Sequence, residues 1–332
     1  MLVTRGVPAP VGEHLAGRCR LEVWEGQGVM PRAELLARVA GKAGLLAMLT
    51  DRVDGELLDA AGPGLRVVAN FAVGHDNLDL EACTARGVLA TNTPDVVTEA
   101  TADLAWALLL AAARRVAEGD RFLRARRPWI WGPEFFLGFE VHGKTLGVIG
   151  LGRIGRAVAR RAAGFAMPVL YTARRRLPPE QEAELGVAWR ELDRLLAEAD
   201  FVSVHTGLSP ATRHLIGAER LARMKPTAVL VNTARGAIVD EAALAAALRA
   251  GELAAAGLDV YELEPEVHPD LLALDNVTLL PHLGSATVKT RTAMGMAAAD
   301  NLLGALAGER PPNLLNPDAL ARPRRSVPWR SG

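Results

Sequence analysis

An arginine, a glutamate and a histidine each follow a short apolar segment of the chain. Arg235, Glu264 and His282 stand in the segments 232–236, 257–265 and 280–285. If the apolar segments are strands of one parallel sheet, the three side chains meet at the edge formed by the strands' carboxyl ends. An imidazole transfers protons near neutral pH, a neighbouring carboxylate orients it, and a guanidinium holds a substrate carboxylate. This set suits the reduction of a 2-keto acid, although each residue taken alone could be structural.

A glycine-rich turn supplies the second chemical signal. Residues 147–155 read Gly-Val-Ile-Gly-Leu-Gly-Arg-Ile-Gly, after an apolar strand and before a helical segment. In this context Gly150 allows a tight turn, Gly152 allows a pyrophosphate to approach the backbone, and Gly155 allows the helix and strand to pack closely. The N-terminus of the helix attracts the anion. The pattern predicts a dinucleotide site.

The next strand indicates which dinucleotide is preferred. It ends in Thr172-Ala-Arg174-Arg175-Arg176, without the carboxylate that binds the ribose 2′-hydroxyl in NAD enzymes. Guanidinium groups suit a 2′-phosphate, although a solvated basic loop is the alternative interpretation. We predict that NADP(H) is preferred and that NAD(H) is possible.

Alternation of apolar segments with helical patterns predicts an α/β chain with two doubly wound domains. We expect a Rossmann cofactor domain, residues 98–287, inserted into a smaller flavodoxin-like substrate domain formed by residues 1–97 and 288–332. An aromatic, aperiodic segment at about 118–142 is expected to be a dimerisation arm. The strands are expected near residues 20–24, 44–49, 65–70, 87–90, 145–149, 169–172, 201–204, 228–231, 254–260 and 277–280.

Composition disfavours several classes of partner. The 332 residues include 38 basic and 38 acidic ones, which disfavours nucleic acid and membrane surfaces. Cys19 and Cys83 have no metal-ligand spacing, and we expect no metal site. The longest apolar run, 104–113, is half of the roughly 20 residues that span a bilayer, and no signal-like segment is present. We expect a cytoplasmic protein.

Four motifs, at residues 70–77, 143–155, 232–236 and 281–286, together resemble the D-isomer-specific 2-hydroxyacid dehydrogenase family. The similarity is greatest to its glyoxylate/hydroxypyruvate reductase branch and runs from about residue 45 to 316. The resemblance implies reduction of a small 2-keto acid, glyoxylate or hydroxypyruvate, to the D-2-hydroxy acid, with His282 as the acid/base paired to Glu264. It also implies a homodimer whose aromatic arm reaches the neighbour's active site.

The resemblance adds residues to the expected site. For the substrate it implies Arg235, His282, the amides of Val73 and Gly74 near Leu49, and the arm's Trp131. Ser285 is also predicted to bind the substrate, and Asp259 would contact the nicotinamide carboxamide. The predicted cofactor-binding residues are Gly150, Gly152, Arg153, Ile154, Gly155, Thr172, Arg174, Arg175, Thr101, His205, Thr212, Thr233, Ala234, Asp259 and Gly284.

Other functions are compatible with the same scaffold. D-lactate, phosphoglycerate or phosphite could be the substrate, whereas formate is disfavoured because formate dehydrogenases pair their histidine with glutamine and this chain has Glu264. A dinucleotide-sensing, corepressor-like protein can keep the same three residues. We expect an enzyme, and turnover with NADPH distinguishes the two classes.

Overall fold

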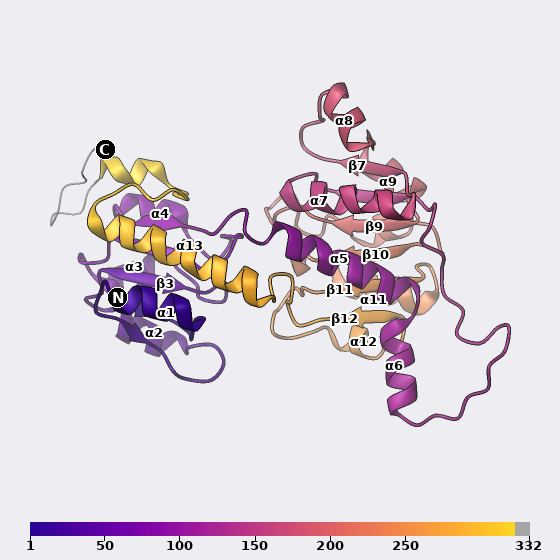
Figure 1. Cartoon of the computed structure of the whole chain (residues 1–332), viewed down its shortest axis with the longest axis horizontal. Helices are drawn as coiled ribbons and strands as arrows, with labels where there is room; N and C mark the ends of the chain where they lie inside the picture. Colours follow the sequence, from indigo (N-terminus) through magenta and orange to yellow (C-terminus); the bar gives the residue numbers. More distant parts are fainter. Residues whose placement is uncertain (323–332) are drawn as a thin grey trace. The chain divides into compact units, whose positions relative to one another are not determined.

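The computed structural model describes residues 1–322, in two compact units (Figure 1). Unit 1 comprises Met1–Val97 and the chain from Ala286 onward, and unit 2 comprises Thr98–Ser285. Each is a parallel sheet with helices on both faces, which confirms the predicted α/β, doubly wound class. That unit 1 binds the substrate and unit 2 the cofactor stays a prediction. Residues 323–332, the end of the predicted substrate domain, lie outside the described residues.

Unit 1 has a five-stranded sheet in the order β2-β1-β3-β4-β5, and all its pairs are parallel. Its strands are β1 Leu2–Val3, β2 Glu22–Val23, β3 Gly44–Ala47, β4 Val67–Asn70 and β5 Leu89–Thr91. Its helices are α1 Ala9–Ala16, α2 Arg32–Val39, α3 Gly55–Ala61, α4 Leu80–Ala85, α13 Val288–Ala307 and the short 3-10 helix η3 Pro317–Ala321.

Two apolar layers enclose this sheet. Leu15 of α1 and Leu302 of α13 pack with Leu46 and Val67 on one face. The helices α2, α3 and α4 cover the other face, where Leu35, Leu58 and Cys83 are buried with strand residues. Since the strands are covered on both faces, they are almost wholly apolar. The carboxyl ends of β3 and β4, neighbours in the sheet, carry the loops that contain Leu49 and the pair Val73–Gly74.

Unit 2 has a seven-stranded parallel sheet in the order β12-β11-β10-β9-β6-β7-β8. From β6 the chain runs to β7 and β8 on one side, then returns to β9 and continues to β12 on the other. The switch point, where ligands bind in open α/β sheets, therefore lies between β6 and β9. The strands are β6 Leu146–Ile149, β7 Val169–Thr172, β8 Val187–Trp189, β9 Phe201–Val204, β10 Val229–Asn232, β11 Ala255–Leu258 and β12 Val277–Leu279.

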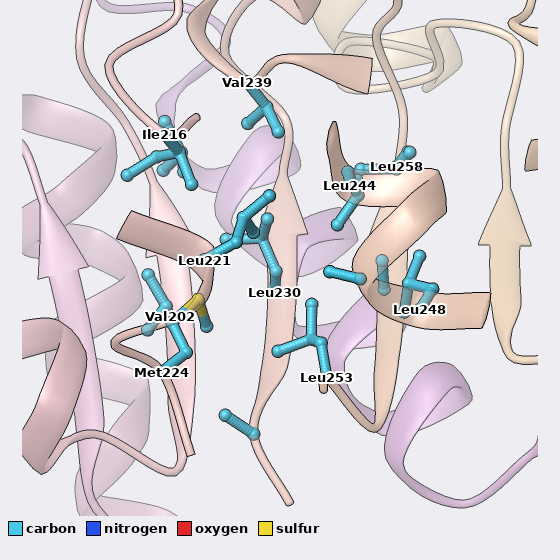
Figure 2. Packing of buried hydrophobic residues seen from close by; sticks show 14 of the residues in the cluster. Val202, Ile216, Leu221, Met224, Leu230, Val239, Leu244, Leu248, Leu253 and Leu258 are labelled. Carbon is cyan, nitrogen blue, oxygen red and sulfur yellow. The ribbon is translucent and has the colours of Figure 1, made fainter. Parts of the chain in front are cut away.

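Helices cover both faces of this sheet as well. Leu108 and Leu109 of α5 and Val158 of α7 pack on one face. On the other, Leu221, Leu244 and Leu248 surround Leu230 of β10, as Figure 2 shows. The helices of unit 2 are α5 Thr98–Ala113, α6 Val116–Arg124, α7 Arg153–Ala162, α8 Pro179–Leu185, α9 Leu192–Glu198, α10 Ala218–Leu221, α11 Glu241–Ala250 and α12 Pro269–Leu272, with the 3-10 turns η1 Ala163–Phe165 and η2 Gly236–Ile238.

Local signals fix several helix ends. The side chains of Asp54, Asp79, Asp240 and Thr287 each accept a hydrogen bond from an amide of the first helical turn. Such N-caps satisfy donors that have no partner within the helix. These caps define where helices α3, α4, α11 and α13 begin.

The expectation of an aperiodic arm at about 118–142 was wrong for residues 118–124, which are helical. Helix α6 occupies Val116–Arg124, and only the following residues, 125–142, lack regular elements. Ion pairs Arg115–Glu118 and Asp120–Arg124, at helical spacing, support this helix. The sequence analysis also missed β1, α1, α4, β8, α8 and α12, which are short. In residues 1–322 no helix is both long and apolar enough to cross a membrane.

Candidate active site

The glycine turn between β6 and α7 lies at the switch point of unit 2. Gly150 has φ +94°, and a Cβ there would lie 2.6 Å from the carbonyl oxygen of His205, which follows β9. A Cβ on Gly155 would lie 2.1 Å from the carbonyl oxygen of Gly150. At Gly152, by contrast, a Cβ would meet nothing within 4 Å, and no side chain caps the helix that follows. The turn is closed on the protein side and open toward an approaching anion, which fits a dinucleotide pyrophosphate.

The three arginines of the loop after β7, Arg174, Arg175 and Arg176, are all exposed. Arg176 also donates to both carboxylate oxygens of Glu182, at 2.9 and 3.0 Å, and its guanidinium lies over the ring of Trp189. Sequence reasoning placed the three guanidinium groups together, and the acidic residue six positions later was the signal that would have separated Arg176. The carbonyl of Thr172 accepts from the amide of Gly150, so this loop adjoins the glycine turn.

The loop after β9 holds two more predicted cofactor residues. The ring of His205 bonds to the hydroxyl of Ser203 at 2.7 Å, and burial lowers the pKa of His205 to about 4. It is therefore neutral at physiological pH. The hydroxyl of Thr212 donates to the carbonyl of Gly207 and accepts from the amide of Ser209, so it closes its own loop.

The side chain of Asn232 stabilises the loop after β10. This side chain accepts a hydrogen bond from the amide of Ala234 and donates one to the carbonyl of Arg235. Thr233 is buried, and its hydroxyl has no hydrogen-bond partner in the described part of the chain. An unpartnered buried hydroxyl costs free energy unless a ligand or water satisfies it, so Thr233 also fits a cofactor site.

Glu264 and His282 form a hydrogen-bonded pair beyond β11 and β12. Nδ1 of His282 donates to Oε2 of Glu264 at 2.8 Å, while Oε1 of Glu264 accepts from the amide of Tyr261 at 3.0 Å. Burial alone would raise the pKa of Glu264, but the bond from His282, the amide of Tyr261 and the charge of Arg235 outweigh it and lower that pKa. Glu264 thus interacts electrostatically with two residues that follow other strands of the same sheet.

Asp259 holds the backbone on which His282 stands. Its main-chain carbonyl accepts from the amide of His282 at 2.9 Å, and its carboxylate accepts from the amides of Leu283 and Gly284. Burial raises the pKa of Asp259. His282 has φ +55°, a left-handed conformation that is uncommon for residues other than glycine. With Nδ1 bonded to Glu264, Nε2 makes no hydrogen bond within residues 1–322 and is available to a substrate.

The remaining predicted residues are spread over both units. In unit 2, the hydroxyl of Thr101 donates to the carbonyl of Gly284, and Ser285 is half-buried just after it. Arg153 and Ile154 form the first turn of α7. Trp131 lies in the arm and is 78% exposed. Leu49, Val73 and Gly74 belong to unit 1. In the described residues no group of three or more His, Cys, Asp or Glu side chains could hold a metal ion.

Comparison with known proteins gives consistent matches. Residues 106–284 match the family described as D-isomer specific 2-hydroxyacid dehydrogenase, NAD binding domain. The chain is 50% identical over 324 residues to a glyoxylate reductase of Thermococcus onnurineus, covering 96% of both chains. A glyoxylate reductase structure from Paecilomyes thermophila gives a TM-score of 0.84 at 35% identity, covering 95% of this chain and 97% of that one. An NADPH-dependent glyoxylate/hydroxypyruvate reductase of Sinorhizobium meliloti, solved with NADP and malonate, gives 0.83 at 34% identity, covering 98% of each.

Proposed function

The chain belongs to the D-isomer-specific 2-hydroxyacid dehydrogenase family of NAD(P)-dependent oxidoreductases, and on this premise we propose that it reduces glyoxylate and hydroxypyruvate with NADPH. The observation that carries the proposal is the bond between Nδ1 of His282 and Glu264, which leaves Nε2 as the nitrogen available to a substrate. Substrate binding is assigned to unit 1 and to Arg235, and cofactor binding to unit 2.

The proton chemistry follows from this pair. The reaction requires a bound nicotinamide to deliver a hydride to the carbonyl carbon of the keto acid. Protonated His282 gives the Nε2 proton to the carbonyl oxygen, which becomes the hydroxyl of the product. Glu264, a carboxylate because its pKa is lowered, stabilises the charged imidazole before transfer and fixes its orientation. Arg235 binds the substrate carboxylate and polarises the carbonyl group.

The choice of substrate is supported by the relatives. Several proteins that cover almost the whole chain at 46–50% identity are glyoxylate reductases. D-Lactate and phosphoglycerate remain alternative substrates of the same chemistry, and a dinucleotide-sensing protein without turnover is the alternative of another class. A sensor would bind the cofactor but oxidise no NADPH.

The preference for NADPH rests on Arg174 and Arg175. Both are exposed at the end of β7, where NAD enzymes have a carboxylate. Two guanidinium groups would bind a 2′-phosphate and gain nothing from a 2′-hydroxyl. Arg176 has no part in this recognition because Glu182 binds it.

Steady-state kinetics test these proposals. NADPH and NADH are each assayed with glyoxylate, hydroxypyruvate, pyruvate and phosphohydroxypyruvate. We expect the highest kcat/KM with the first two acids, and with NADPH over NADH. His282→Ala should lose most of kcat and still bind the cofactor. Rapid turnover by this variant, or none by the native protein, would overturn the assignment.

Matched arginine variants test the cofactor preference. Arg174→Ser with Arg175→Ser should raise the KM for NADPH and leave the KM for NADH unchanged. Arg176→Ser is the control, since it removes one positive charge from the same loop without touching the proposed phosphate site. Equal effects of the two changes on the NADPH/NADH ratio would contradict the assignment.

We also propose that the arm contacts a second copy of the chain. In residues 125–142, Trp129 is 55% exposed, Ile130 88% and Trp131 78%, an unusual amount of apolar surface. The rings of Phe122, Phe135 and Phe136 pack together, and Trp129 stacks on Phe135, so the segment has a defined shape. If Trp131 serves the neighbour's active site, mixing Trp131→Ala with His282→Ala subunits restores activity. No gain on mixing would contradict that role.

A further inference from the structure

Three successive carbonyl groups in the loop after β4 are each held by a specific donor. The carbonyl of Ala72 accepts from the amide of Thr93 at 2.9 Å, and that of Val73 accepts from the side chain of Asn92 at 2.8 Å. The carbonyl of Gly74 accepts from the side chain of Asn70 at 2.9 Å. All of these residues belong to unit 1.

Holding a carbonyl also orients the amide of the next residue. A peptide group is planar and, where trans, points its C=O and N–H in opposite directions. The only cis bond among the described residues is Glu264–Pro265. The bonds to Ala72 and Val73 therefore aim the N–H groups of Val73 and Gly74 away from their donors. Within residues 1–322 neither of these amides donates a hydrogen bond.

We propose that Asn92 is a positioning residue for the substrate: its side-chain amide, by binding the Val73 carbonyl, sets the direction in which the Gly74 N–H meets the substrate carboxylate. This inference rests on the proposed function, in which Val73 and Gly74 bind that carboxylate. Amide–carboxylate bonds are charge-assisted and depend on alignment, so a misdirected N–H weakens binding.

The main chain at Asn92 is held independently of its side chain. Its carbonyl accepts from the side chain of Asn301 at 3.1 Å, and its amide donates to the carbonyl of Asn313 at 3.4 Å. The side chain, in a residue only 8% exposed, binds the Val73 carbonyl. Removing it therefore frees the Val73–Gly74 peptide more than it disturbs the end of β5.

A second asparagine pair joins this loop to the loop that contains Leu49. Asn70 and Asn77 exchange two side-chain hydrogen bonds, each 3.1 Å long. Asn77 also donates to the carbonyls of Met48 and Asp51, on either side of Leu49. The two loops after β3 and β4 therefore share one network, in which Asn92 fixes the peptide nearest the proposed carboxylate contact.

The test compares Asn92→Leu with Asn316→Leu in the full-length protein. Asn316 is a matched control because it is also buried and binds the amide of Ala90 in β5 and the carbonyl of Val88 just before it. It has no bond to the 72–74 loop. We expect Asn92→Leu to raise the KM for glyoxylate about tenfold, the equivalent of one charge-assisted hydrogen bond, with kcat and cofactor affinity little changed. Asn316→Leu should lower the melting temperature and leave KM unchanged.

Equal KM values in Asn92→Leu and the native protein, or an equal rise in Asn316→Leu, would overturn the proposal. If Asn92→Leu does not fold, Asn92→Ser, too short to reach the Val73 carbonyl, replaces it with the same expectation. A separate readout uses protein labelled with ¹⁵N-glycine. The Gly74 amide signal should shift on titration with oxamate, and this response should be lost in Asn92→Leu.

The two readouts distinguish failure of this inference from failure of the proposed function. If the native protein turns over no 2-keto acid and its Gly74 amide signal does not shift with oxamate, the proposed function fails. If the native protein turns over glyoxylate but the Asn92 variant responds like the native protein, only the positioning role fails.

Discussion

A Cβ added to Gly236 would lie 1.8 Å from the carbonyl carbon of Tyr261. Gly236 follows Arg235 directly, and the amide of Tyr261 holds one carboxylate oxygen of Glu264. The loops that carry the proposed substrate arginine and the partner of His282 are therefore packed backbone to backbone. Their close approach explains how Arg235 comes near enough to lower the pKa of Glu264.

Gly236→Ala should separate these loops. We expect a loss of stability of about 1–3 kcal/mol, typical of overpacking, and a lower kcat/KM for keto acids. Thermal unfolding and steady-state kinetics measure both effects. Gly164→Ala is the control, because a Cβ there meets nothing within 4 Å, and it should change neither quantity. Native activity and stability in Gly236→Ala would show that the two loops can separate without consequence.

Substitutions at Gly152 and Gly155 should separate an effect on cofactor binding from an effect on stability. Gly155→Ala places a Cβ against the carbonyl of Gly150 and should lower the melting temperature. Gly152→Ala meets no protein atom, so its melting temperature should stay near that of the native protein while NADPH binds more weakly. Calorimetric unfolding and titration with NADPH separate the two effects. Unchanged NADPH affinity in Gly152→Ala would contradict the assigned approach of the pyrophosphate.

The pH profile of reduction should depend on Glu264. Since the pKa of Glu264 is lowered, its carboxylate persists below the ordinary value of about 4.3, and the pair with His282 is lost only as pH falls through the lowered pKa. The acid limb of kcat/KM should therefore lie below the ordinary pKa of a glutamate carboxyl group. In Glu264→Gln this limb should disappear, and the rate should be lower throughout because a neutral amide stabilises a charged imidazole less. An acid limb retained in Glu264→Gln would assign it to another group.

Asp200 should stabilise unit 2 at neutral pH and cease to do so in acid. Burial opposes its ionisation, but Lys225 at 2.7 Å and the amide of Thr145 outweigh burial and lower its pKa. The contribution is complete above the unfolded pKa of about 3.9 and is lost as pH falls through the lowered folded value. Asp200→Asn should cost about 1 kcal/mol at pH 7.

Thermal unfolding at pH 7 and pH 3 measures the difference in stability between the native protein and Asp200→Asn, which should be smaller at pH 3. Asp193→Asn is the control, because that carboxylate pairs with Arg220 at an exposed site. A difference between native protein and Asp200→Asn that stays constant over this range would mean that the carboxylate charge is not the cause.

The amino-acid sequence alone determined the local features. Apolar periodicity placed six strands of unit 2 within a residue or two of their observed ends, and the glycine spacing identified a turn in which only glycine fits at 150 and 155. It also indicated that Arg235, Glu264 and His282 follow strands of one parallel sheet. Short elements such as β1, β8 and α8 escaped prediction because two to seven residues carry too little periodicity.

Tertiary structure alone decided which partner each polar group binds. Asp259 holds the backbone of His282 and Gly284, and Asn92 binds the Val73 carbonyl. Such pairings join residues that lie on different strands or loops, and they depend on strand register and helix packing. A sequence pattern records the spacing of residues along the chain, whereas a hydrogen bond depends on distance and direction in space, which exist only once the sheets have formed.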